Sequence, residues 1–261
     1  MDNLKSLLFA HLIGFYFCNH INIHWTTCII GYSNYLLYTY LYKLSFNNVY
    51  FAMSITPKNY IDPLHGSHKL ISYGYSTYHA VFLALSATLY LLNIIDNYDI
   101  KQVFFISISY YSADIYYVIN STKKLTKLDY FTICHHIVMI LMYYVIFIEI
   151  YINQENTLLY YMNRGILAEY SVLTLNYSWY LINTKQDNTN NMLISSVLTV
   201  VLYFITRVIN FTRLIYNFWD DDLLFGIVLM MPLFLINYYW FYKLMHKAVR
   251  IYHKTKFLKK T

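Results

Sequence analysis

Charged residues lie in short clusters along this chain, and long apolar stretches separate the clusters. Each stretch approaches the roughly 20 residues that an α-helix needs to cross a bilayer. Charged residues make up only 12% of the 261 positions, whereas a soluble globular protein carries about a quarter. A helix satisfies its own backbone hydrogen bonds inside a bilayer. The pattern therefore predicts an all-α fold, a polytopic transmembrane helical bundle.

The apolar windows predict about seven membrane spans. They lie at residues 24–44, 71–92, 102–120, 130–150, 158–182, 192–216 and 223–245. A further apolar run, residues 4–18, is shorter than a span requires, and we expect it to lie in the interface or to insert halfway. Six or eight spans are the alternatives to seven.

The loops between these spans differ in charge. If the spans alternate in direction, basic residues gather on the side that holds the C-terminus and acidic residues on the opposite side. By the positive-inside rule, we expect a multi-pass protein with a cytoplasmic C-terminus. We expect the basic tail, residues 252–261, to contact anionic lipids and not nucleic acid, because nothing else in the sequence offers a folded basic surface.

Several ionisable residues fall inside the predicted spans, where a charge costs roughly 2.5–3.5 kcal/mol and is usually paired or functional. They are His79, Asp114, His135, His136, Arg164, Glu169 and Arg207, with the polar Asn176 and Asn210 beside them. We interpret four as candidates to line a substrate cavity: His79, Asp114, Glu169 and Asn176. For Arg164 and Arg207 we favour pairing with opposite charges on other helices, which would fix the bundle.

His135 and His136 are the strongest candidates for chemistry. Adjacent residues point about 100° apart around a helix axis, so one ring can do chemistry while the other packs or orients its partner. Neutral imidazole can take or give a proton near neutral pH. The alternative is that both rings only form hydrogen bonds between helices. We predict no metal site, because two histidines on one metal need the i, i+4 spacing.

Three segments resemble successive blocks of one known family, the TLC domain. They read LDYFTICHHIVMILMYYVIF, NRGILAEYSVLTLNYSWYL and YFITRVINF, and YSTYHAVFLALSATLY and YSADIYYVI resemble the family's first two helices. The translocating-chain-associating membrane protein, the ceramide synthases and a ceroid-lipofuscinosis protein share this domain. The resemblance covers residues 66–251, leaving residues 1–65 as an N-terminal segment with one or two membrane helices and 252–261 as the tail.

The resemblance implies six helices in a barrel-like core, in the endoplasmic reticulum. In ceramide synthases the histidines that match His135 and His136 are needed to transfer an acyl group from acyl-CoA to a long-chain amine. The resemblance thus implies acyl-CoA as a co-substrate, no bound cofactor and membrane lipids as partners; it names no protein partner. Heavy use of tyrosine, isoleucine and asparagine is typical of AT-rich genomes and suggests a protist or giant amoebal virus, hence a host reticulum if viral.

One departure from ceramide synthases affects the predicted activity. Where those enzymes carry an acidic pair after the arginine, this chain reads Ala168-Glu169-Tyr170-Ser171, as do less characterised members of the family. Two hypotheses therefore stay open. The chain is either an acyl-CoA-dependent lipid acyltransferase that uses His135 and His136, or a non-catalytic membrane factor that binds lipid or protein cargo or tunes lipid composition.

Overall fold

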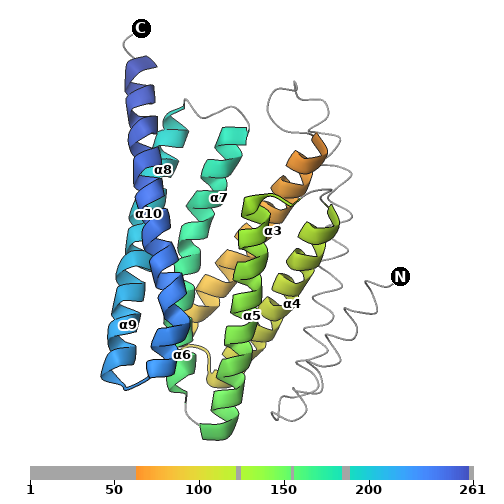
Figure 1. Cartoon of the computed structure of the whole chain (residues 1–261), viewed down its shortest axis with the longest axis vertical. Coiled ribbons are helices and arrows are strands. Elements are labelled where there is room, and N and C mark those ends of the chain that lie inside the picture. Colours follow the sequence, from red (N-terminus) through yellow and green to blue (C-terminus); the bar gives the residue numbers. More distant parts are fainter. Residues whose placement is uncertain (1–62, 122–124, 154–155, 184–188, 259–261) are drawn as a thin grey trace. The chain divides into compact units, whose positions relative to one another are not determined.

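The structure is a computed structural model that describes residues 63–121, 125–153, 156–183 and 189–258 (Figure 1). Every regular element within these ranges is a helix, which confirms the predicted all-α class. The predicted span at 24–44 and the short run at 4–18 lie outside the described residues. The six later predicted spans, from 71–92 to 223–245, all fall on helical segments.

The helices follow one another with short connections. In chain order they are α3 (Pro63–Leu91), α4 (Asn97–Ser121), α5 (Lys127–Asn153), α6 (Thr157–Ile166), the 3₁₀ turn η1 (Leu167–Glu169), α7 (Tyr170–Asn183), α8 (Asn190–Tyr203), the π-helix η2 (Phe204–Ile209), α9 (Asn210–Asp220) and α10 (Leu224–Leu258). Segments α8, η2 and α9 form one continuous helical stretch.

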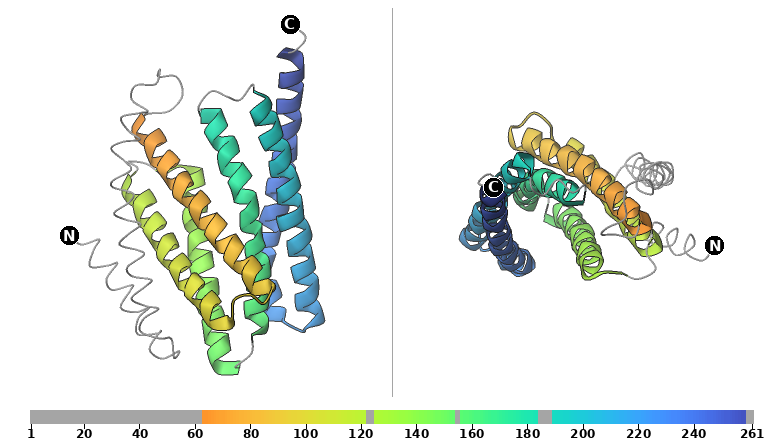
Figure 2. Two further views of the ribbon diagram at one scale, coloured as in Figure 1. Left: turned by 180° about the vertical axis from the view of Figure 1, so that it is seen from behind. Right: turned by 90° about the horizontal axis from the view of Figure 1, so that it is seen from above.

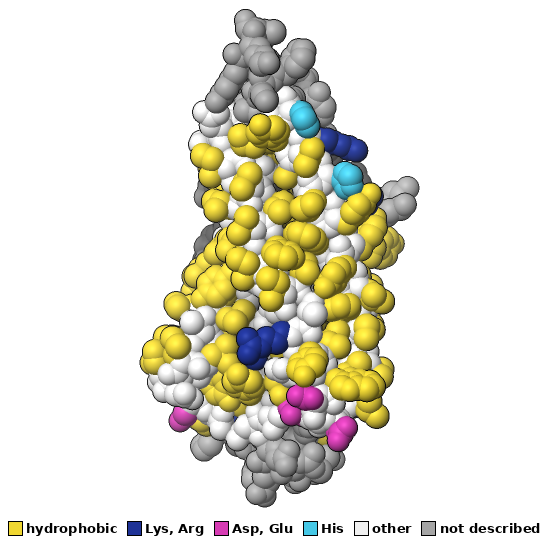
Figure 3. Space-filling view, turned by 90° about the vertical axis from the view of Figure 1, so that its left-hand side faces the viewer, with side chains coloured by type: hydrophobic (Ala, Val, Ile, Leu, Met, Phe, Trp, Pro, Cys, Tyr) yellow, Lys and Arg dark blue, Asp and Glu magenta, His cyan; other side chains and the backbone are white. Residues whose placement is uncertain are grey.

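Three helical stretches within the described residues are long and apolar enough to cross a membrane. They are Asp129–Ile148, Asn190–Asp220 and Gly226–His253. Hydrophobic side chains cover most of the face in Figure 3, with acidic side chains toward one end and histidine toward the other. The chain is therefore an integral membrane protein, while the count of seven spans and the barrel-like core stay predictions.

The chain divides into two compact units, which are described separately below. The first contains residues 1–72 and 96–159, and the second contains residues 73–95 and 160–261. In the first unit α4 packs along α5 (Figure 1). Aromatic rings fill this contact: Phe104 stacks on Tyr143 with ring centroids 4.6 Å apart, and Phe105 stacks on Phe147 at 4.8 Å.

In the second unit α8 packs against both α7 and α10, and α9 packs against α10 (Figure 2). Small hydroxyl side chains lie between α7 and α8, where Ser178 bonds Ser195 at 2.7 Å and Thr199 at 3.4 Å. Lipid tails are as apolar as a helix surface, so close packing and hydrogen bonds of this kind drive helix association in a bilayer.

A tight turn joins α9 to α10. Asp222 has φ of 55°, and the Leu223 N–H bonds the Phe218 carbonyl at 2.8 Å, which is the Schellman ending of a helix. The chain reverses at once, and Gly226 of α10 comes against the Phe218 ring: a Cβ built on Gly226 would lie 3.2 Å from it. Phe218 itself packs edge-on against Tyr161.

We expect Gly226→Ala to destabilise the protein by about 1 kcal/mol, because the added methyl overpacks a buried contact. The matched control is Gly74→Ala in α3, where no atom lies within 4 Å of the added Cβ. That change should cost nothing, since alanine favours a helix over glycine. The free energy of unfolding in mixed micelles measures both. An equal response of the two variants would contradict a close Gly226–Phe218 contact.

Candidate functional site

Side-chain caps fix where the helices of the first unit begin. At α4, Asp96 accepts hydrogen bonds from the backbone N–H groups of Tyr98 at 2.8 Å and Asp99 at 2.9 Å. At α5, the Thr126 backbone N–H donates to the Asp129 carboxylate at 2.7 Å, and the Asp129 N–H donates to the Thr126 hydroxyl at 3.3 Å. This reciprocal arrangement is a capping box. The caps fix the residue at which each of these helices begins.

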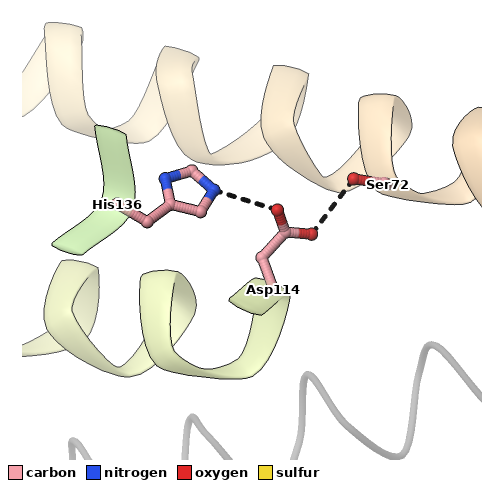
Figure 4. A network of polar contacts seen from close by, with 3 residues as sticks. All are labelled: Ser72, Asp114 and His136. Atoms are coloured by element: carbon pink, nitrogen blue, oxygen red, sulfur yellow. Dashed lines mark hydrogen bonds and ion pairs between the residues drawn. The ribbon is translucent and has the colours of Figure 1, made fainter. Parts of the chain in front are cut away.

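With these helix starts, Asp114 of α4 meets His136 of α5. The His136 Nε2 lies 2.9 Å from the Asp114 Oδ2, and the Ser72 hydroxyl donates to Oδ1 at 3.1 Å (Figure 4). Asp114 is only 1% exposed and His136 only 7%. The carboxylate thus lies between a serine and an imidazole, and all three groups belong to the first unit.

The contact with Asp114 decides which nitrogen of His136 is basic. An ionised carboxylate only accepts hydrogen bonds, so it assigns the proton of the neutral ring to Nε2. Nδ1 then carries the free lone pair. Within the described residues Nδ1 is buried and has no hydrogen-bond partner. His136 therefore has one basic nitrogen, Nδ1, while its other ring nitrogen, Nε2, contacts a carboxylate, as in a catalytic histidine–aspartate pair.

His135 lies in different surroundings, as the 100° separation predicts. It is half-buried, and its ring meets Tyr111 nearly edge-on at 6.4 Å between centroids. The Tyr111 ring is closer to His136, at 4.7 Å, and Tyr110 lies 5.9 Å from His136. Both tyrosines are buried and shield His136 from water. The two histidines are thus not equivalent.

The remaining cavity candidates lie in the second unit. Asn176 of α7 is buried and donates to the Tyr73 carbonyl at 3.2 Å and the Thr77 hydroxyl at 2.9 Å, so it ties α7 to α3. His79 is buried in α3, and Glu169 is half-buried in η1. No group of three or more His, Cys, Asp or Glu side chains within the described ranges could hold a metal ion.

The two arginines also lie in the second unit, beside neutral groups. Arg164 stands over the Tyr160 ring at 5.9 Å, and its carbonyl accepts from Asn210 at 2.6 Å. Arg207 donates to Ser171 and Asn237. Among the described residues the ion pair that forms is His136–Asp114, and it includes neither arginine. The pairing of Arg164 and Arg207 with opposite charges stays a prediction.

Some members of these clusters could not be singled out from the sequence. Ser72 belongs to a polar stripe on its helix, but nothing in the stripe indicates that Asp114 is its partner. Asn237 is one amide in the apolar run FLINYYWF, which is a usable signal, since a polar side chain in a span needs a partner. Ser171 gives no such signal, because serine is common in membrane helices.

Apolar helices of membrane-spanning length and a buried histidine–carboxylate pair define this protein as a multi-pass helical membrane protein with a polar interior site. The family model described as TLC domain matches residues 66–246, about two thirds of the chain. The chain belongs to the TLC domain family, and the resemblance seen in the sequence is confirmed. No curated protein and no solved structure matches the chain.

Proposed function

We propose that this protein transfers an acyl group from acyl-CoA to a lipid acceptor within the membrane. The observation that carries the proposal is the buried contact of 2.9 Å between His136 and Asp114 in a TLC domain. The carboxylate fixes the proton of the neutral imidazole on Nε2 and leaves Nδ1 as the nitrogen that can accept a proton. Burying such a pair in a membrane is costly, and ionisable residues within membrane spans are usually functional.

The proposed step uses the Nδ1 of His136 as a general base. Nδ1 takes the proton from an acceptor amine or hydroxyl while the acceptor atom attacks the thioester carbonyl. The carbon–sulfur bond then breaks, and the imidazolium returns the proton to the departing thiolate. Asp114 stabilises the imidazolium while it exists, and Ser72 holds the other carboxylate oxygen. In this proposal Asp114 and Ser72 are positioning residues.

The proposal places the protein in the endoplasmic reticulum membrane with its C-terminus in the cytoplasm. Two observations support this orientation. The exposed side chains Lys243, Lys247 and Arg250 follow one another along the C-terminal part of α10. Asp220, Asp221 and Asp222 lie just before that helix begins. Acyl-CoA is made available on the cytoplasmic side, where basic side chains would attract its phosphates.

The experiment is acyl transfer in membranes that contain the full chain. Labelled acyl-CoA is supplied with sphingoid bases in one arm and lysophospholipids in the other, and products are followed by mass spectrometry. We expect labelled product in at least one arm and none in membranes without the protein. If the wild-type chain transfers nothing to either acceptor class, acyl transfer to these lipids is excluded. The His136–Asp114 pair would then be a structural contact that links α4 to α5.

The structure also predicts how transfer responds to the carboxylate. Asp114→Asn should lower the rate by about 10²-fold, because an amide no longer fixes the proton on Nε2 or stabilises the imidazolium. Ser72→Ala is the matched control. It removes one hydrogen bond to the same carboxylate and should lower the rate only a few-fold. Equal losses in both variants would mean that Asp114 acts only through packing.

A further inference from the structure

A second polar cluster lies in the second unit, centred on Arg207. The guanidinium donates from Nε to the Ser171 hydroxyl at 2.8 Å and from Nη1 to the Asn237 Oδ1 at 3.3 Å, and it stands 5.1 Å from the centre of the Tyr203 ring. Tyr203 donates to the same Asn237 oxygen at 2.9 Å. Ser171, Asn237 and Tyr203 are all buried. Side chains from η1–α7, α8 and α10 thus hold Arg207 in one orientation.

The cluster lies deep within a membrane-spanning stretch. Arg207 is near the middle of Asn190–Asp220, the longest apolar stretch among the described residues. A rise of 1.5 Å per residue puts it about 20 Å or more from either end. It also lies in the π-helix η2, and single π-turns inside α-helices occur frequently at functional sites. A long side chain at this depth reaches the interface only with difficulty.

The charge of Arg207 has no counter-charge in its cluster. Every described hydrogen-bond partner of the guanidinium is a neutral group, and the ion pair found among the described residues does not include Arg207. A guanidinium has five N–H donors, of which the described partners take two. Arg207 is half-buried, so part of the residue is accessible. Arg207 is thus a cation held in place by neutral groups, with N–H donors that its described partners do not use. Such a group is suited to bind an anion.

We propose that Arg207 binds the carboxylate of a fatty acid whose chain lies in the bilayer. A carboxylate is planar and accepts two parallel hydrogen bonds from one guanidinium edge. The neighbouring exposed side chains are apolar, as a hydrocarbon chain requires: Phe204, Ile205 and Ile209. A phosphate headgroup is larger and more strongly hydrated, and it stays at the interface. The site belongs to the second unit and does not include His136, and the inference does not rest on acyl transfer.

The test measures binding by the purified full-length protein in lipid nanodiscs of neutral phospholipid. The probe is a photoreactive palmitate, and competitors are palmitate, its methyl ester and dipalmitoyl phosphatidic acid. We expect Arg207→Met to weaken palmitate binding about tenfold or more, since a charge-assisted contact is lost. The matched control Arg213→Met removes an exposed arginine from α9 and should leave binding unchanged. Photo-adducts should map to η2 or its neighbours.

Three outcomes would overturn the proposal. The first is equal labelling of wild type and Arg207→Met. The second is competition by the methyl ester as strong as that by palmitate, which would show that the headgroup charge is irrelevant. The third is stronger competition by phosphatidic acid, which would assign the site to phosphate. If Arg207→Met does not fold, Arg207→Lys keeps the charge but loses the planar fork, and it should bind palmitate several-fold more weakly.

Discussion

His136→Gln is expected to lower acyl transfer by at least about 10³-fold, whereas His135→Gln should keep the rate within about fivefold of wild type. Glutamine suits this test because its amide can still donate to Asp114 in place of the Nε2–H. It cannot take up a proton. The variant therefore removes the base but keeps the buried hydrogen bond that the structure shows.

The two adjacent substitutions control for each other. They make the same chemical change one residue apart in α5, so expression, insertion and general helix stability are matched. Initial rates at saturating acyl-CoA, divided by the amount of folded protein, give the comparison. An equally large loss in both variants would show that His135 is also required. Loss of transfer only in His135→Gln would show that His135, and not His136, is the base, and it would contradict the proposal.

Asn237→Leu is expected to lower the free energy of unfolding by about 2–4 kcal/mol. Leucine branches at Cγ as asparagine does, but it has no hydrogen-bond acceptor. Two donors depend on the Asn237 oxygen, the Tyr203 hydroxyl at 2.9 Å and the Arg207 Nη1 at 3.3 Å. Asn237 is only 3% exposed, so water does not readily replace the lost acceptor. The unfolding transition in mixed micelles is the measurement.

Two further variants define the cause of that loss. Asn191→Leu makes the same change at an exposed position of α8 and should be close to neutral. Asn237→Asp keeps the acceptor and adds a negative charge beside Arg207, so it should retain most of the stability. It should also weaken palmitate binding, because the guanidinium then has an internal counter-ion. If Asn237→Asp is as unstable as Asn237→Leu, the lost acceptor is not the cause of the instability.

The fold class follows from the sequence because the bilayer admits few solutions. Charge clusters bracket apolar stretches, and within the described residues each of the later predicted spans falls on helix. The sequence pattern misses the interruptions at η1 and η2, since hydrophobic periodicity does not register a local change in hydrogen bonding. The seven-span count and the barrel-like core remain predictions from the sequence and the family.

The candidate site was only partly predictable. His136 and Asp114 can each be singled out from the sequence, because an ionisable group inside an apolar span is costly. Their pairing does not follow from the sequence, since it depends on the relative rotation of α4 and α5. For Arg207, charge alone does not identify the partners of the side chain. A basic residue in a span suggests an acidic partner, yet its described partners are an amide and a hydroxyl.

The capping box at the start of α5 has a consequence for the histidine doublet. Thr126 and Asp129 fix the start of the helix, and Asp129 lies almost two turns before His136. A shift of one residue rotates the helix by about 100° and would turn His135 toward the position that His136 occupies. The adjacent histidines therefore allow two rotations of the helix, each of which places one imidazole at that position. With the helix start that Thr126 and Asp129 fix, it is His136 that meets Asp114.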